Sequence, residues 1–475
     1  MQVAYSLVLF ILGIIFAQIF EKSLFFALAT GYLWGLFLSV LPSFVSLLLF
    51  GALNLAFYYF CSFILVLALL VVAVRKRAFS SVLKSFRALH VGCILLFVAL
   101  ASLFTKYNFS VGSIDSLAFY IQPGMQFFSN SPVSIAPLFS SVGVFLSLAH
   151  GPVSLWGDEY YYLLHPLLFV SFCAVFTWFF CQSHALNKNF KRLFFWLLAG
   201  IWGLSSFFVF FNVFYIHTNM PSAIYLFLAV ACFSYAVRQK DAGLLSLFFA
   251  AIFAFSLMRV EAPFFAAGLV FFSGLSFDEF EGIPLSKLGL LFFPISLWNL
   301  RLMWMLQGGE GLAGPFLLGG QALGLLLLPA FLWVVKKLQI NKGYLRKYAL
   351  AGAGAVVLLL AFTRFDNFAI NIVSIFVNIF FVGRWGSLWW GILILTFFCN
   401  KDIQKNTSVH FFIYYVVFYF LSLLLLGNMR VPYRLGWGDS ANRMLLTIFP
   451  LLFFVVLSSL YRLIWGGAEE SSASL

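Results

Sequence analysis

The chain consists of long apolar runs separated by short polar breaks. The runs are continuous and do not alternate between apolar and polar residues, which is typical of helices and not of membrane barrel strands. A helix crosses a membrane with about 20 mainly apolar residues. The pattern therefore predicts crossings over residues 3–20, 24–50, 52–74, 89–106, 162–181, 193–216, 221–237, 243–257, 263–275, 288–306, 317–335, 348–362, 386–399, 409–427 and 444–465.

The predicted fold class is all-α, a polytopic transmembrane helical bundle with about 12–16 spans. Residues 1–106 are expected to form N-terminal transmembrane helices, and residues 107–161 a short extracytoplasmic acidic loop with amphipathic helices. Residues 162–465 are expected to form a transmembrane helical core, and residues 466–475 a polar tail.

The basic breaks set the expected orientation, because Lys and Arg collect in cytoplasmic loops. RKRAFSSVLKSFR (75–87) and KKLQINKGYLRK (336–347) are the strongest such breaks. Counting crossings from them places Asp115 on the extracytoplasmic side. The same count leaves residues 364–384 without a crossing, so we predict an interfacial or re-entrant helix there, with Asn367, Asn371 and Asn378 on its wetter side.

Composition agrees with this class, since 63% of the residues are hydrophobic and 9% are charged, unlike a soluble domain. The net charge of +13 would suggest nucleic acid in a soluble protein. Here the cytoplasmic loops explain it, and no nucleic-acid partner is expected. The six cysteines have no metal-like spacing. Met1 to Phe20 lacks a basic leader and a clear cleavage site, so we expect a retained first helix.

The stretch from Ser113 to Leu168 carries Asp115, Asp158 and Glu159, three of only 15 carboxylates. Asp115 could take a proton from an acceptor hydroxyl at the outer interface. The alternative is a helix N-cap, and both roles are compatible. Asp158 and Glu159 precede the next crossing, where the helix dipole would stabilise both charges, a structural role at least as well supported as a catalytic one.

Further candidate residues lie beside this stretch and after it. His150 and His165 have no ligand spacing with one another or with the acids, so no metal site is expected from them. Arg259 and Glu261 interrupt an apolar run one residue apart, which on a regular helix would keep them from facing each other. Pro263 favours a loop here, and the alternative to a functional role is a snorkelling pair at the interface.

Three arginines, Arg430, Arg434 and Arg443, gather near Asp439 in a loop that the topology places outside. Arginines are usually more frequent in cytoplasmic loops than in extracytoplasmic ones. A phosphate partner would explain them, because a guanidinium matches phosphate oxygens. Pairing with Asp439 and with lipid headgroups is the equally weighted alternative.

Four segments resemble the GT-C class of polytopic membrane glycosyltransferases, in particular the bacterial relatives of the protein O-mannosyltransferases and aminoarabinose transferases. They are IDSLAFYIQPGMQFF, YIHTNMPSAIYLFLAVACF, SLMRVEAPFF and SANRMLLTIFPLL, and the resemblance covers roughly Asn108 to Pro450. The N-terminal part departs from the family pattern. The family usually has one span before the catalytic aspartate, whereas the predicted spans 3–20, 24–50, 52–74 and 89–106 precede Asp115.

The resemblance implies an inverting glycosyltransferase that moves a sugar from a polyprenyl-phosphate carrier to a lipid, glycan or protein hydroxyl on the extracytoplasmic face. Asp115 matches the family's catalytic aspartate. Asp158 and Glu159 would help orient acceptor or sugar, and Arg259, Arg434 and Arg443 would bind the carrier phosphate. Glu261 is a further candidate for substrate binding.

No cofactor is required for this reaction, with a divalent cation as an option. We expect the protein in the bacterial inner membrane among membrane lipids. The rival functions are a transporter or flippase of lipid-linked glycans, expected to place charges near the midplane and to show repeat halves, and a glycan polymerase.

Overall fold

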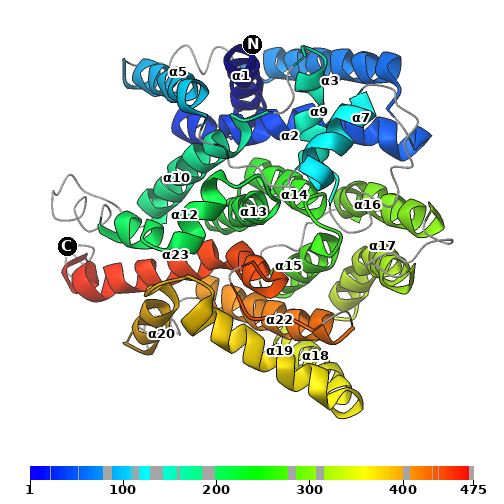
Figure 1. The fold of residues 1–475 in the computed structure, drawn as a ribbon, viewed down its shortest axis with the longest axis vertical. Coiled ribbons are helices and arrows are strands. Elements are labelled where there is room, and N and C mark those ends of the chain that lie inside the picture. The colour runs from blue at the N-terminus through cyan, green and yellow to red at the C-terminus, as the bar shows by residue number, and fades with distance from the viewer. Residues whose placement is uncertain are drawn as a thin grey trace. The chain divides into compact units, whose positions relative to one another are not determined.

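The fold is that of a computed structural model, which describes residues 1–21, 23–51, 53–78, 88–108, 110, 117–128, 143–157, 161–183, 198–276, 285–305, 315–398, 407–429, 432–436 and 438–469. Within these ranges the regular elements are all helices (Figure 1). The all-α prediction is confirmed.

Ten helices in the described part of the chain are long and apolar enough to cross a membrane, and they indicate an integral membrane protein. They are α1 (Gln2–Phe20), α2 (Leu24–Phe50), α3 (Leu55–Arg75), α5 (Ala88–Tyr107), α10 (Leu164–Ser183), α13 (Asn219–Gln239), α17 (Pro315–Lys337), α18 (Lys342–Thr363), α19 (Phe365–Val377) continued by η3 (Asn378–Val382), and α23 (Ser440–Glu469).

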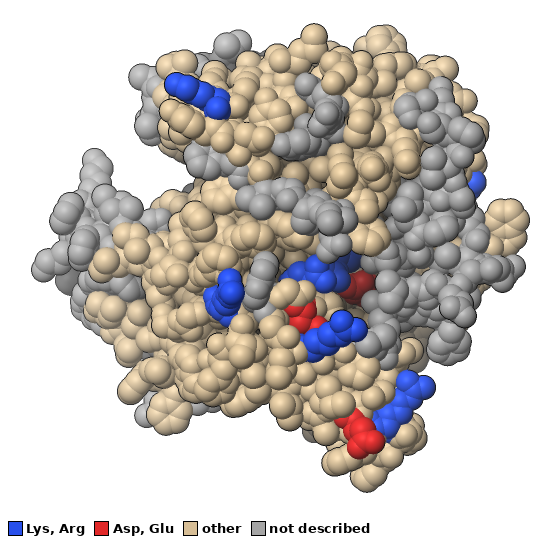
Figure 2. Space-filling view, in the orientation of Figure 1, with Lys and Arg blue, Asp and Glu red and all other residues tan. Residues whose placement is uncertain are grey.

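The remaining helices complete the described chain. They are η1 (Leu117–Ile121), α7 (Gln122–Phe128), α9 (Phe145–Ser154), α12 (Phe207–Phe214), α14 (Ala242–Ser256), α15 (Ala262–Ser276), α16 (Leu285–Met305), α20 (Leu388–Phe398) and α22 (Thr407–Met429). On the face seen in Figure 2, most of the described residues are uncharged, and only a few are Lys, Arg, Asp or Glu. A count of crossings above ten remains a prediction.

One predicted crossing, residues 193–216, is not a single helix in its described part. The helix that precedes Ser205 stops there, and α12 begins at Phe207. The Ser206 hydroxyl accepts a hydrogen bond from the Val209 N–H at 3.3 Å and donates one to the Arg384 carbonyl at 3.1 Å. A serine that caps a new helix competes with continuation of the old one, which apolar content alone does not reveal.

The chain forms two compact units. Unit 1 comprises Met1–Phe179, Val213–Ala266 and Ile283–Ala330, and unit 2 comprises Phe180–Asn212, Ala267–Gly282 and Phe331–Leu475. In unit 1, α1 and α2 pack closely because Gly13 and Gly35 each face the backbone of the other helix, where any side chain would overlap it. Small residues allow such close approach between membrane helices.

In unit 2, α22 packs against α18 and α19. The aromatic core there includes Trp385, which is buried against Phe208 and Phe449. Its indole N–H donates to the Asn442 side chain, so the buried polar edge of the ring is satisfied.

Candidate functional site

The candidate site in unit 1 is centred on the bend His217–Asn219, which leads into α13. All three residues are buried. Pro221 follows in the first turn of α13, where a missing N–H costs nothing. The Ser222 N–H and hydroxyl both bond to the Thr218 carbonyl, so the helix start is fixed.

An ion pair lies against this bend. Residues 257–261 form turns between α14 and α15, which confirms the predicted loop. The Arg259 Nε donates to Glu261 Oε1 at 2.6 Å, and its Nη1 donates to Asn219 Oδ1 at 3.0 Å. The Glu261 side chain is only 2% exposed and that of Arg259 is 17% exposed, so the pair is not a snorkelling pair at the surface.

The space enclosed beside Arg259 is small. A cavity of about 10 Å³ is lined by Arg259 together with Gly143, Ser256 and Trp298, among others. Such a volume holds about one water molecule. A sugar phosphate does not fit there and would have to reach the guanidinium from its exposed edge.

A chain of buried polar side chains extends from the bend. Tyr120, from η1, has its hydroxyl 3.3 Å from His217 Nε2 and 3.4 Å from the Thr218 hydroxyl. His165, near the start of α10, has Nε2 at 3.1 Å from the His217 carbonyl and 3.3 Å from the His217 N–H. When Nε2 carries the proton it can donate to the His217 carbonyl, and when it does not it can accept from the His217 N–H. His165 therefore bonds to the backbone of the bend in either tautomer.

His150, in α9, extends the chain further. Its ring lies parallel to that of His165, with centroids 6.4 Å apart, and its Nδ1 accepts a hydrogen bond from the Tyr161 N–H at 3.1 Å. The Tyr161 hydroxyl in turn contacts the Ser6 and Tyr32 hydroxyls. Polar contacts thus connect α1 and α2 with His150, whose ring lies beside that of His165.

The hydrogen bond at Nδ1 also determines the chemistry of His150. A neutral ring that accepts at Nδ1 carries its proton on Nε2, and that nitrogen then has no lone pair for a metal. Burial, with a smaller contribution from His165, lowers the pKa of His150 to about 3, so the ring is neutral at physiological pH. Among the residues that the structure describes, no group of three His, Cys, Asp or Glu could hold a metal ion.

The three predicted acids Asp115, Asp158 and Glu159 lie outside the described residues, as does Arg430. The side chains around the bend, those of Tyr120, His165, His217, Asn219, Arg259 and Glu261, form a polar cluster. Described residues that follow the acids in sequence contact this cluster or the neighbouring His150. Tyr120, five residues after Asp115, contacts His217, and Tyr161, two residues after Glu159, contacts His150.

The predicted residues Arg434 and Arg443 belong to unit 2, where both contact Asp439 through their backbone. The Asp439 carboxylate accepts from the N–H groups of Arg434 at 2.9 Å and Ala441 at 2.8 Å. The Arg443 N–H donates to the Asp439 carbonyl at 3.1 Å. Asp439 therefore caps α23. Its contact with Arg434 does not use the guanidinium, and the Arg434 side chain is exposed.

Asparagines hold the loop that carries Arg434. The Asn378 amide donates to the Arg434 carbonyl and accepts from the Gly436 N–H, both at 2.8 Å. Asn371 Oδ1 accepts from the Tyr433 N–H at 2.8 Å. The prediction that Asn371 and Asn378 face the wetter side is wrong, because both are 0% exposed. Their amides satisfy backbone groups of the loop, as buried polar groups must.

Comparisons with protein-family models, with curated proteins and with solved structures found no match to this chain. The arrangement of residues therefore carries the functional argument.

The structure brings Arg259 and Glu261 together in one unit, and groups Arg434 and Arg443 around Asp439 in the other. Sequence reasoning missed Tyr120, His165, His217 and Asn219 as members of the polar cluster. A signal existed, since four of the six histidines fall between residues 150 and 217. A histidine in an apolar helical chain needs a polar partner.

Proposed function

We propose that the chain is an integral membrane glycosyltransferase. It moves a sugar from a polyprenyl-phosphate carrier to a lipid, glycan or protein hydroxyl on the extracytoplasmic face, with inversion at the anomeric carbon. The reaction requires no cofactor, and a metal chelator tests whether a divalent cation assists.

One observation carries the proposal. Three of the four segments that resemble the GT-C class contribute side chains to one cluster in unit 1: Tyr120 follows Asp115 in the first, His217 and Asn219 lie in the second, and Arg259 and Glu261 lie in the third. These segments are far apart in sequence. Their meeting at the start of a helix, with one arginine held by two partners, supports a common role.

The proposed roles follow from the chemistry of each group. Asp115 takes the proton of the acceptor hydroxyl as general base. The acceptor oxygen bonds to the anomeric carbon, the bond from that carbon to the phosphate oxygen breaks, and the electron pair leaves with the phosphate. Arg259 stabilises this leaving charge.

The remaining predicted residues orient the reactants. Glu261 and Asn219 fix the guanidinium of Arg259, which reduces the cost of positioning it. Asp158 and Glu159 orient acceptor or sugar. Arg434 and Arg443 provide further phosphate-binding groups.

A transporter or flippase of lipid-linked glycans is the second candidate. The buried Arg259–Glu261 pair and the buried histidines His150, His165 and His217 favour this function, because ionisable groups inside a membrane bundle also line transport pathways. The two functions differ in their product, since a transferase forms a new glycosidic bond and a transporter does not.

The test is mass spectrometry of lipid-linked sugars and surface glycans in cells with and without the chain. The proposal predicts that loss of the chain causes one carrier-bound monosaccharide to accumulate and one glycan, glycolipid or glycoprotein to lose that sugar. Accumulation of a carrier-bound oligosaccharide on the cytoplasmic side would favour the flippase. Unchanged carrier-bound sugars and glycans would contradict both.

A further inference from the structure

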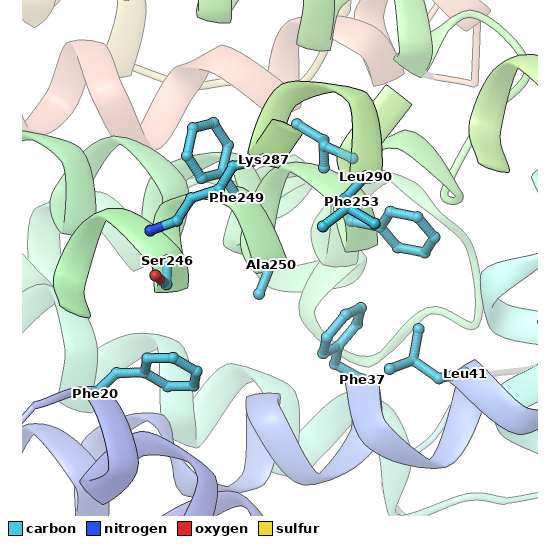
Figure 3. Close-up of a pocket in the computed structure, with 10 residues that line it drawn as sticks. Phe20, Phe37, Leu41, Ser246, Phe249, Ala250, Phe253, Lys287 and Leu290 are labelled. Carbon is cyan, nitrogen blue, oxygen red and sulfur yellow. The ribbon is translucent and has the colours of Figure 1, made fainter. Parts of the chain in front are cut away.

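An open groove in unit 1 is separate from the candidate site. It has a volume of about 380 Å³ and is lined by residues of α1, α2, α14 and α16 (Figure 3). All but two of the lining residues are apolar, the exceptions being Ser246 and Lys287. This volume lies in the range of small-ligand sites, about 300–1,000 Å³.

The two ends of the groove differ in character. Lys287 and Ser246 lie with Phe20 at one end, while Phe37, Leu41 and Phe253 lie at the other (Figure 3). A lysine at one end of an otherwise apolar groove matches a ligand with an anionic head and a hydrocarbon tail.

A second lysine strengthens the basic end. The Lys76 Nζ donates to the Ile19 carbonyl at 3.1 Å and lies 5.5 Å from the centre of the Phe20 ring. In the described part of the chain, neither Lys76 nor Lys287 forms an ion pair with a carboxylate. Asp278, Glu279 and Glu281, which precede Lys287 in sequence, lie outside the described residues.

Four helix ends meet at these lysines. α1 ends at Phe20, α3 ends at Arg75, α14 begins at Ala242 and α16 begins at Leu285. Phe20 lies against Gly243 at the start of α14. Helix ends with lysines are typical of the level of lipid headgroups, and the basic break 75–87 predicts that this is the cytoplasmic side.

We propose that this groove binds an anionic phospholipid, with its phosphate at Lys287 and one acyl chain between α2, α14 and α16. Basic pockets between transmembrane helices on the cytoplasmic side recognise anionic headgroups in this way. The inference does not depend on the glycosyltransferase proposal.

The carrier lipid of the proposed reaction is a poor occupant of this groove. Ser246 lies near the start of α14, and Arg259 follows the other end of the same helix. Ten residues of helix, about 15 Å, separate Ser246 from the last residue of α14. A phosphate at Lys287 is therefore far from the guanidinium that would hold the carrier.

The test is native mass spectrometry of the purified full chain, equilibrated with phosphatidylglycerol and phosphatidylcholine of identical acyl chains. Wild-type protein should retain phosphatidylglycerol preferentially. Lys287→Gln should lower that preference by about fivefold, the effect of one lysine near an anionic lipid surface. Lys347→Gln removes the same charge from an exposed position on α18 and should leave the preference unchanged.

A second variant tests the tail of the groove while the charge is kept. Ala250 lines the groove, so Ala250→Phe should fill part of it and lower retention of both lipids. Equal retention of the two lipids by wild-type protein would overturn the proposal. So would an unchanged preference in Lys287→Gln, which would assign the lysine to pairing within the protein.

Discussion

The polar cluster of unit 1 and the arginine loop of unit 2 satisfy buried polar groups in two different ways. In unit 1, charged and polar side chains bind one another, as Arg259 binds Glu261 and Asn219. In unit 2, asparagine amides bind the backbone of the loop, and the Arg434 side chain is left exposed. The first arrangement fixes its arginine in place, whereas the second fixes a backbone and leaves its arginine side chain exposed.

The largest stability effect should come from breaking the ion pair of unit 1. Glu261→Ala leaves the Arg259 charge without its buried partner, which costs about 3–5 kcal/mol. The check is thermal or denaturant unfolding of the full chain in detergent. Arg259→Met combined with Glu261→Leu should recover much of the loss, because an apolar pair needs no compensation. If Glu261→Ala is as stable as the wild type, the ion pair contributes little to the free energy of unfolding.

The asparagine clamp of unit 2 should have a smaller and more local effect. Asn378→Ala removes the partners of the Arg434 carbonyl and the Gly436 N–H, which costs about 1–3 kcal/mol. Hydrogen exchange at the Gly436 amide should become faster. Asn367→Ala, on the same helix and partly exposed, is the matched control. Equal exchange rates at the Gly436 amide in both variants would show that Asn378 does not hold this loop.

Close to neutral pH, the smallest effect should be a pH dependence in unit 1. Because the pKa of His150 is lowered to about 3 in the folded protein, protonation favours the unfolded chain, whose histidines titrate near about 6.5. Stability is therefore complete above that pH and falls as the pH drops toward 3, by at most about 1.4 kcal/mol per pH unit. His150→Gln should reduce this dependence when Tm is compared at pH 7 and pH 5. If Tm changes with pH equally in the variant and in the wild type, other groups cause the dependence.

Long apolar runs were sufficient to predict most helices of both units. Predicted crossings such as 24–50 and 221–237 correspond closely to α2 and α13, because their hydrophobic content alone determines a membrane helix. The break before α12 could not be predicted, since Ser206 stops the helix through a contact with the distant Arg384 carbonyl.

The candidate sites were predictable only in part. The turn around Arg259 followed from its spacing to Glu261 and from Pro263. The burial of Asn371 and Asn378 did not, because their partners Tyr433, Arg434 and Gly436 lie more than 50 residues away. The contacts of His150, His165 and His217 could not be predicted either, because these residues lie in or beside three different helices. Polar residues in an apolar chain indicate that partners exist, and only the fold shows which ones.

We propose Asp115 as the base in sugar transfer, and the loss of this carboxylate should greatly slow transfer without unfolding the protein. Transfer from a polyprenyl-phosphate sugar is measured with purified full chain in lipid vesicles, once the donor has been identified. Asp115→Asn should lower the rate by about 10²–10⁴-fold, with folding unchanged by Tm. The control Asp366→Asn, at an exposed position, should keep the wild-type rate. Wild-type transfer by Asp115→Asn would show that this carboxylate is not the base.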